Sequence, residues 1–462
     1  MYNIGFIAGK LGDVDGVSLE VDKWINVLQG FGHQVYTLSG RYGGPLEAVP
    51  EENRFTDESL RFDSPFQRAL EQEVFPHLGK LTPHVNSRRR KRIIEELKKR
   101  GAETANRLFE FIYSQGIDVL IAENTNAMPM TLLGGMAVYQ LAVNRRVATI
   151  FHHHDFWWER SRFSHSRIEP LLTRTMPPAD PGLEHVVLSS YAAHILRSLK
   201  HVQPKVIPNC EDFEHPVVMD EYNGDFRKEL GFSPRDILVL QPTRMVPRKR
   251  IEDSIALCAA LAKDYPDLAG RIHLVVSLGQ GDEPDTDYSG YVADLAEKRG
   301  VPLHLIASRV GSRRGMDTQG RKIYTNRDVL AHADLVTYLP IWEGFGNALL
   351  EALAARVPVV TTTYLVYKTD IRGTLLRNIE IRDVYGPDGG LVIPRRALEE
   401  IHYVLTNPEE RKIITDRNSA IAGREFGLET LRCRLKEVLE DYSDEIKASR
   451  RRIRQGGAFY SV

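Results

Sequence analysis

Two carboxylates in the C-terminal half of the chain have a spacing that suits one long ligand. Glu343 and Glu351 lie eight positions apart, the first in a glycine-containing turn and the second in a run of good helix formers. Eight helical residues rise about 12 Å, whereas the paired acids of glycoside hydrolases stand about 5 to 9.5 Å apart. We therefore expect the two side chains to hold different parts of an elongated ligand.

The residues between these carboxylates are suited to binding oxygen atoms. The expected helix begins at Asn347, so the amides of Phe345, Gly346 and Asn347 have no helical partner. Free amides at a helix start bind phosphate or sugar oxygens. Gly344 and Gly346 let such a ligand approach the backbone closely.

A cluster of cations follows the predicted strand Ile237–Gln241. It consists of Arg244, Arg248, Lys249 and Arg250. A guanidinium group binds phosphate oxygens in pairs, and a lysine adds a mobile point charge. The cluster predicts an anion site, although Arg248 and Arg250 are equally well explained as surface charges.

Polar side chains also end two predicted strands of the N-terminal half. Glu123 and Asn124 follow the strand Ile117–Ala122, and the run His152–Asp155 follows Arg146–Phe151. Open α/β sheets bind ligands at the carboxyl ends of their strands. Three successive histidines suggest zinc, but neighbours in an extended chain point to opposite faces, so one ion cannot take all three. We expect no metal.

The motif from Glu343-Gly344-Phe345-Gly346 to Glu351, set between a buried strand and an Ala/Leu helix, resembles the nucleotide-sugar site of the family-four retaining glycosyltransferases. Arg244 and Lys249 match the family's cation pair, in the expected order. The segment Val206–Asn209 matches the end of its first domain. The resemblance implies an α/β protein of the GT-B fold, with two doubly wound Rossmann-like domains facing a cleft and a C-terminal helix that crosses back.

The resemblance also implies roles on the donor side. Glu343 would hold the sugar hydroxyls and Glu351 the ribose hydroxyls. Arg244 and Lys249 would neutralise the diphosphate as it leaves. Further donor contacts are implied for Gly16, Ile306, Gly344, Phe345, Gly346 and Asn347.

On the other side, the family has a histidine, often followed by aspartate, that contacts the acceptor or the donor sugar. His154 and Asp155 match this pair best, and His153 stays open as an alternative. Glu123 and Asn124 are the remaining candidates for acceptor binding. The resemblance implies catalytic roles for Glu343, Arg244, Lys249 and His154, with front-face attack assisted by the leaving phosphate.

One loop departs from the family pattern. Where many relatives have a glycine-rich turn, this chain has Tyr364–Lys368. Together with the aromatic run that follows His154, this loop resembles synthases of glycosylglycerate-type compatible solutes. The expected reaction moves glucose or mannose from a UDP- or GDP-sugar to a small polar acceptor: a sugar, a sugar phosphate or a glycerate-type solute. We expect retention, no cofactor, and no need for Mg²⁺ in the chemistry.

Three alternatives remain. A peripheral-membrane glycosyltransferase with a lipid-linked acceptor would use the basic run Arg88–Arg92, which is otherwise a solvated helix face. A nucleotide-sugar epimerase shares the architecture but lacks the Arg/Lys pair combined with the two-glutamate motif. A non-catalytic nucleotide-sugar sensor is compatible with the same binding residues.

Length predicts more than one core, since 462 residues exceed the usual size of one domain. We expect an acceptor-side domain over 1–210 with a helical insertion near 41–116, and a nucleotide-sugar-binding domain over 211–425. The remainder, 426–462, is expected to pack on the first domain through a long charged helix, Leu428–Arg454. A homodimer is possible.

Charge and cysteine content narrow the partners. The chain has 61 basic and 62 acidic residues, which gives a net charge of −1 and no overall field that would attract nucleic acid. Three scattered cysteines form neither a disulfide framework nor a metal motif, which fits a reducing cytoplasm. No apolar run is long enough to span a membrane. Contact with a membrane surface is possible but not favoured.

Overall fold

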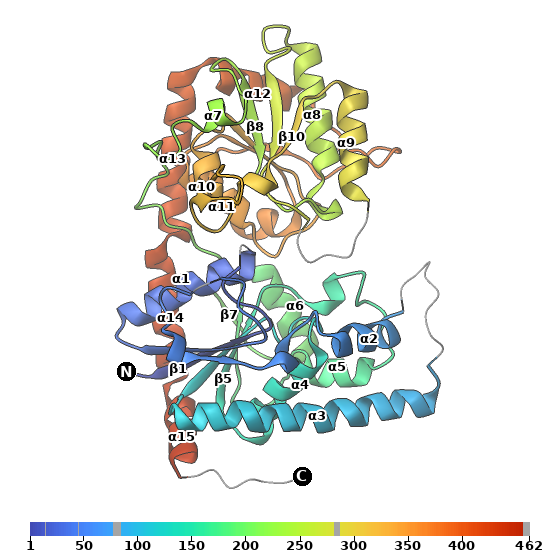
Figure 1. Cartoon of the computed structure of the whole chain (residues 1–462), viewed down its shortest axis with the longest axis vertical. Coiled ribbons are helices and arrows are strands. Elements are labelled where there is room, and N and C mark those ends of the chain that lie inside the picture. Colours follow the sequence, from blue (N-terminus) through green and yellow to red (C-terminus); the bar gives the residue numbers. More distant parts are fainter. Residues whose placement is uncertain (14, 45, 77–84, 281–286, 456–462) are drawn as a thin grey trace. The chain divides into compact units, whose positions relative to one another are not determined.

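The computed structural model describes residues 1–13, 15–44, 46–76, 85–280 and 287–455. The chain forms two compact units. Unit 1 comprises Met1–Pro208 and Leu431–Val462, and unit 2 comprises Asn209–Thr430. In both units strands alternate with helices, and the strands of the main sheet pair in parallel, as the sequence pattern predicted (Figure 1).

Unit 1 contains a seven-stranded parallel sheet in the order β3-β2-β1-β4-β5-β6-β7. Its central strands are almost fully buried, as expected for a parallel sheet covered on both faces. The strands are β1 (Asn3–Ala8), β2 (Gln34–Ser39), β3 (Arg54–Thr56), β4 (Val119–Glu123), β5 (Ala148–His153), β6 (Glu184–Val187) and β7 (Lys205–Val206).

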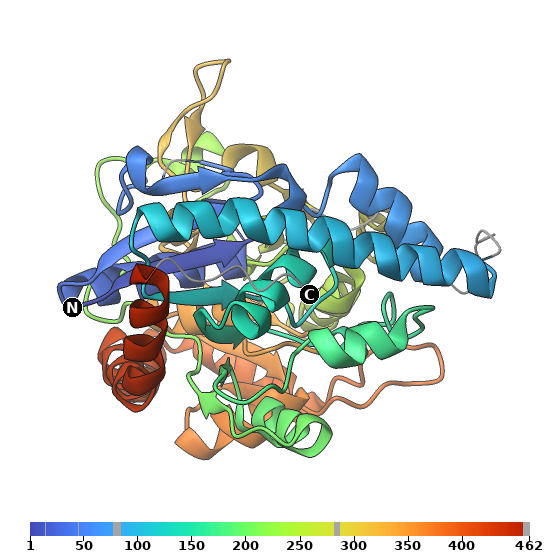
Figure 2. The same cartoon turned by 90° about the horizontal axis from the view of Figure 1, so that it is seen from below.

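The helices of the N-terminal part cover this sheet. They are α1 (Gly16–Gly30), α2 (Pro65–Val74), α3 (Ser87–Ser114), α4 (Leu132–Tyr139), α5 (Glu169–Thr175) and α6 (Ser190–Lys200). The long helix α3 lies across one face of the sheet (Figure 2). Its residues Leu108 and Ile112 pack in one cluster with Leu38 of β2 and Leu120 of β4. The segment 41–116 is therefore not a purely helical insertion, because it also supplies the edge strand β3.

The chain returns to unit 1 at its C-terminal end, as predicted. Two helices, α14 (Leu428–Asp441) and α15 (Ser443–Arg454), replace the single helix expected. Between them, the hydroxyl of buried Tyr442 donates to the carbonyl of Gly182 at 2.6 Å and accepts from the amide of Thr149 at 3.1 Å. These bonds tie the break between the helices to the sheet.

Unit 2 contains a six-stranded parallel sheet in the order β10-β9-β8-β13-β14-β15. Its strands are β8 (Ile237–Gln241), β9 (Ile272–Val276), β10 (Leu303–Leu305), β13 (Leu335–Tyr338), β14 (Val359–Thr362) and β15 (Ile379–Ile381). A short hairpin pairs β11 (Gly315–Met316) with β12 (Lys322–Ile323). The helices are α7 (Phe226–Glu229), α8 (Ile251–Asp264), α9 (Tyr288–Arg299), α10 (Asn326–Leu330), α11 (Asn347–Ala354), α12 (Arg395–Thr406) and α13 (Pro408–Phe426).

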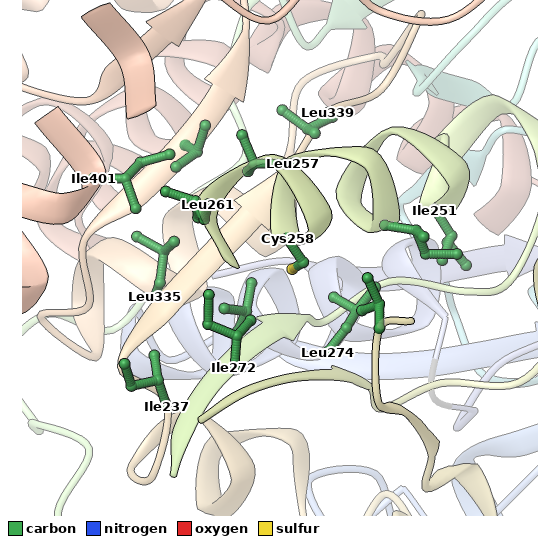
Figure 3. Packing of buried hydrophobic residues seen from close by; sticks show 14 of the residues in the cluster. Ile237, Ile251, Leu257, Cys258, Leu261, Ile272, Leu274, Leu335, Leu339 and Ile401 are labelled. Carbon is green, nitrogen blue, oxygen red and sulfur yellow. The ribbon is translucent and has the colours of Figure 1, made fainter. Parts of the chain in front are cut away.

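One apolar cluster holds unit 2 together. Helix α8 places Ile251, Cys258 and Leu261 against Leu274 of β9 and Leu335 of β13 (Figure 3). All five side chains are at most 1% exposed. Burial raises the pKa of the Cys258 thiol to about 12, so this cysteine is an inert core residue.

The strand orders fix where ligands can bind. In each sheet the winding direction reverses once, between β1 and β4 in unit 1 and between β8 and β13 in unit 2. Parallel sheets of this kind bind ligands beyond the carboxyl ends of the strands at such a reversal. Glu123 ends β4, and the cation cluster and Glu343 follow β8 and β13. Among the described helices, none is both long and apolar enough to cross a membrane.

Candidate functional site

The turns after β8 and β13 bring three charged side chains together in unit 2. Arg248 Nη1 lies 2.9 Å from Glu343 Oε1, and Lys249 Nζ binds the same oxygen. Lys249 also lies over the ring of Tyr338, 5.5 Å from its centroid. Arg248 therefore belongs to the cluster and is not a plain surface charge, whereas Arg250 turns away and pairs with acidic residues of α8.

The electrostatics of this cluster favour an anion. Burial lowers the pKa of Lys249 to about 8; Glu343 acts in the opposite direction, and the neighbouring Arg248 and Arg244 add to the lowering. The side chain of Arg244 makes no hydrogen bond or ion pair with any residue that the structure describes. Arg248 and Lys249 thus bind Glu343, and Arg244 lies close enough to Lys249 to lower its pKa, so the cluster could bind a diphosphate.

The start of α11 offers the amides that the sequence predicted. Within the described part of the chain, the amides of Gly344, Phe345 and Gly346 have no hydrogen-bond partner. Gly346 caps the helix with a φ of 135°, a backbone conformation that favours glycine. The side chain of Asn347 is held by Asn209, which follows β7 in the chain.

The loop Tyr364–Lys368, which departs from the family pattern, contacts the turn before α11. The Tyr364 hydroxyl donates to the carbonyl of Phe345 at 2.6 Å, and its ring packs edge-on against Tyr338. Both tyrosines are at most 1% exposed. A methyl group at Gly346 would lie 2.6 Å from the Tyr364 hydroxyl, so the two residues fit together only with glycine there.

Glu351 is held by a network that sequence reasoning did not find. The Asn326 amide donates to Glu351 Oε2 at 2.6 Å, and Ser277 donates to Asn326 Oδ1 at 2.7 Å. Asn326 is the first residue of α10 and was not among the predicted site residues. Its pairing with Glu351 depends on how α10 and α11 pack, which no local motif specifies.

In unit 1, the strand ends β4 and β5 bring Glu123 together with two of the three histidines. Glu123 Oε2 lies 3.0 Å from His152 Nδ1 and 3.2 Å from His154 Nε2. Burial alone would raise the pKa of Glu123, but the two imidazoles outweigh it and lower the pKa to about 2. The carboxylate is therefore ionised inside the protein.

The alternation predicted for the three histidines is observed, and it removes His153 from the candidates. His153 points to the opposite side of β5, is 1% exposed, and its Nε2 lies 3.0 Å from His185 Nδ1 of β6. Burial and the nearby His185 hold the pKa of His153 well below its usual range. His153 is a neutral core residue, and the expectation that it binds the acceptor is wrong.

Asn124 and Asp155 brace the turn around His154. Asn124 adopts a left-handed conformation with a φ of 54°. Its side-chain oxygen accepts from the amide of His154 at 3.2 Å, and its nitrogen donates to Asp155 Oδ1 at 3.1 Å. Asp155 is also paired with Arg160, which sequence reasoning did not consider.

The resemblance implied two further donor contacts, at Gly16 and Ile306. Gly16 is the first residue of α1, where Asp15 caps the helix by accepting from the amides of Val17 and Ser18. Ile306 follows β10, but its amide donates to the Val276 carbonyl at 3.0 Å and its own carbonyl accepts from an amide three residues on. Both backbone groups of Ile306 thus take part in hydrogen bonds within the protein.

The residue types of the Glu123 group could by themselves suggest a metal. One possible ligand atom from each of Glu123, His152 and His154 lies within 4.8 Å of the other two. Glu123 lies at ordinary hydrogen-bond distances from both imidazoles, which accounts for the grouping. We assign them no metal.

The chain is similar to known proteins along most of its length. The profile described as glycosyl transferases group 1 matches residues 223–372. The chain is 30% identical over 454 residues to the mannosylglucosylglycerate synthase of Thermotoga maritima, over 94% of this chain and 98% of that protein. It is 29% identical over 428 residues to the mannosylglucosylglycerate synthase of Petrotoga mobilis, over 88% and 94% of the two chains.

Solved structures share the arrangement of two parallel sheets. Anabaena HepE, in complex with UDP and glucose, superposes with a TM-score of 0.60 at 15% identity, over 95% of this chain and 100% of that one. Sucrose-phosphate synthase from Thermosynechococcus elongatus gives a TM-score of 0.60 at 14% identity, over 96% and 99%. At this identity the likeness concerns the fold.

Proposed function

Because the chain belongs to the group 1 glycosyltransferases of the GT-B fold, among the relatives that make glycosylglycerates, we propose that it transfers a hexose from a UDP- or GDP-sugar to a glycerate-type acceptor, with retention at the anomeric carbon. The name of its relatives favours mannose as the sugar and a glucosylglycerate as the acceptor. The single observation that carries the proposal is the partly buried cation cluster beside free amides in unit 2.

That cluster suits the hardest step, which is departure of the nucleoside diphosphate. Arg244, Lys249 and the amides of Phe345 and Gly346 would stabilise the charge that develops on the leaving oxygen. Fixed cations and dipoles can supply this without a metal, so we propose that Mg²⁺ is not required. Arg248 would act through Glu343, by sharing that carboxylate with Lys249.

We propose that the reaction retains the anomeric configuration without Glu343 acting as a nucleophile. Its carboxylate already binds two cations, which makes it a weak nucleophile, so it would hold sugar hydroxyls instead of forming a covalent intermediate. We propose that the acceptor hydroxyl attacks from the face on which the diphosphate leaves and passes its proton to that diphosphate. Glu351, steadied by Asn326, would bind the ribose.

On the acceptor side, the proposal assigns binding to the strand ends of unit 1. His154 would orient the acceptor, with Glu123, Asn124 and Asp155 holding the turn around it. His153 has no part in it.

The test begins with ligand binding. A panel of nucleotide sugars is screened for thermal stabilisation, since a ligand at a hundred times its dissociation constant adds about 2.7 kcal/mol to the free energy of unfolding. Nucleotide release is then measured with glycerate, glucosylglycerate, free sugars and sugar phosphates, and NMR of the product reads the anomeric configuration. Failure of every nucleotide sugar to stabilise the protein, or an inverted product, would refute the proposal.

A lipid-linked acceptor is the second candidate, favoured by the charge of α3. Arg88, Arg90, Lys91 and Arg92 are exposed, while Arg89 pairs with Glu73. Flotation with anionic and neutral vesicles separates the two candidates. We expect no flotation; strong binding to anionic vesicles that is lost when these exposed cations are replaced by glutamine would favour the lipid.

A further inference from the structure

We propose that Glu123 and His152 are positioning residues that fix the ring of His154, with Nε2 held inward and Nδ1 presented to an oxygen of the acceptor. This inference rests on the proposed function for the identity of the ligand. The arrangement of the three side chains is independent of it.

The geometry of the group leaves His154 little freedom. One oxygen of Glu123 lies within hydrogen-bond distance of both imidazoles, at 3.0 Å from His152 Nδ1 and 3.2 Å from His154 Nε2. The two rings stand 4.5 Å apart, and the backbone amide of His154 donates to the side chain of Asn124. A ring flip of His154 would break its bond to Glu123, so one orientation is strongly preferred.

The charge on Glu123 decides which atoms carry protons. Its side chain is fully buried, and a buried carboxylate is tolerated only when it is paired and hydrogen-bonded. Since the carboxylate is ionised, it accepts from both rings. His152 must therefore carry its proton on Nδ1, and His154 must carry one on Nε2.

His152 serves as an inert support. Its ring stacks on Trp24 at 4.1 Å, and its Nε2 is buried without a hydrogen-bond partner among the described residues. A second proton there would be a buried, unpaired donor, so burial lowers the pKa of His152 and keeps it neutral.

His154 is the imidazole whose protonated form the group favours. Burial lowers its pKa, but the hydrogen bond and charge of Glu123 outweigh burial, with smaller contributions from Glu20 of α1 and from Asp155, so the pKa is raised. Neutral His152 and the Arg160 guanidinium that pairs with Asp155 are the other groups nearby. The imidazolium thus has a second N–H, on Nδ1.

That second N–H is the one available to a ligand. The His154 side chain is 10% exposed, and its Nδ1 has no hydrogen-bond partner among the residues that the structure describes. A charged N–H of fixed direction donates a strong hydrogen bond to an oxygen lone pair. A hydroxyl or carboxylate oxygen of a glycerate-type acceptor provides one.

The test replaces Glu123 by its uncharged isostere. Side-chain ¹⁵N spectra of histidine-labelled protein, with His154→Gln for assignment, follow the protonation of His154 across pH. In Glu123→Gln we expect His154 to lose its proton about one to three pH units lower than in the wild type, because an adjacent opposite charge is removed. The alkaline fall of kcat/KM for the acceptor should move by the same amount, while the KM for the donor stays unchanged.

Two further variants keep the result decisive if Glu123→Gln folds poorly. His152→Phe keeps the stack on Trp24 but leaves Glu123 bound to His154 alone, so the proton of His154 should be lost at higher pH, the opposite direction. His185→Asn is the matched control, because it breaks the other buried imidazole pair of β5. This control variant should lower the melting temperature and leave the pH profile of kcat/KM for the acceptor unchanged.

Three outcomes would overturn the inference. His154 could titrate identically in the wild type and Glu123→Gln. Glu123→Gln and His152→Phe could lose thermal stability without any change in the pH profile of kcat/KM for the acceptor, which would make the group purely structural. The purified wild type could hold one divalent metal ion per chain that Glu123→Gln loses, which would make it a metal site. The NMR result needs no turnover, so absence of sugar transfer would refute the proposed function without touching this inference.

Discussion

Lys249 links the charge of the donor site to pH. Its pKa is lowered to about 8, so below pH 8 the free protein already carries the charge that binds the diphosphate. A bound diphosphate favours the charged form and raises this pKa. Donor affinity should therefore be constant up to pH 8 and then fall up to tenfold per pH unit, since one pH unit corresponds to 1.36 kcal/mol. Calorimetric titration with UDP and GDP between pH 6.5 and 9.5 measures this.

The control separates this lysine from general charge effects. Lys249→Met should bind the nucleotide weakly at every pH and lose the dependence above pH 8. Lys263→Met removes an exposed cation of α8 and should retain the wild-type curve. A pH dependence that survives in Lys249→Met would assign the titration to another group.

Gly346 is the residue whose backbone the donor site depends on most. Gly346→Ala forces a side chain into a φ of 135° and places its Cβ 2.6 Å from the Tyr364 hydroxyl. We expect the free energy of unfolding to fall by about 1–3 kcal/mol, the usual cost of such a conformation, and nucleotide affinity to fall with it. Urea denaturation and calorimetry measure the two effects.

Gly373→Ala is the matched substitution, because its new Cβ would meet no atom within 4 Å. Its free energy of unfolding should change by less than about 0.5 kcal/mol, as is usual for a surface site. Equal losses in both variants would mean that the Gly346 conformation carries no special strain.

At the scale of elements, an ion pair between Arg450 of α15 and the buried Asp118 attaches this helix to the rest of unit 1. Both side-chain nitrogens of Arg450 that face Asp118 lie 2.6 Å from its oxygens, and Asp118 is 5% exposed. Arg450→Met should cost about 1–3 kcal/mol, because it leaves a buried carboxylate without its charged partner. Arg434→Met breaks the exposed pair with Glu437 and should cost under about 1 kcal/mol.

Chemical denaturation of both variants checks this, provided that the change in exposed surface on unfolding stays the same. If Arg450→Met were as stable as Arg434→Met, the ion pair would not hold α15. The buried side chains of Ile446 and Ile453 and the hydrogen bond from the Ala148 amide to Ser449 would then carry the attachment.

The elements also explain how far the sequence could be interpreted. Strands, helices and the cation cluster were predictable because their signals are local: apolar runs, helix formers and charges at a strand end. The turn at Gly346 and the amides beside it were predictable for the same reason. The alternation of His152, His153 and His154 followed from strand geometry alone.

Pairings between distant elements were not predictable. Arg248 meets Glu343 because β8 and β13 are neighbours in the sheet, and Asn326 meets Glu351 because of how α10 and α11 pack. The role of Glu123 depends on the register that places it opposite His152, one strand away. Such contacts come from tertiary structure, and a single sequence contains no direct signal of register.

At the scale of the whole molecule, the GT-B fold is confirmed and each of its units has a reversal point and a core of its own. The free amides and the cation cluster belong entirely to unit 2, whereas the His154 group belongs to unit 1. A nucleotide and an acceptor should therefore affect different stretches of the chain. This separation gives a test that needs no mutation.

Hydrogen exchange on the complete chain measures which stretches each ligand affects. With UDP or GDP alone we expect slower exchange of the backbone amides in 242–252 and 341–350, because bound phosphate oxygens would take up the free amides and hold the two turns. The stretch 150–160 around His154 should keep its rate until an acceptor is added. Uridine or guanosine, which lack the diphosphate, should leave Gly344 and Gly346 unprotected. Protection by the nucleotide confined to 150–160 would contradict the assignment of the donor to unit 2, since every cation and amide invoked for it lies there.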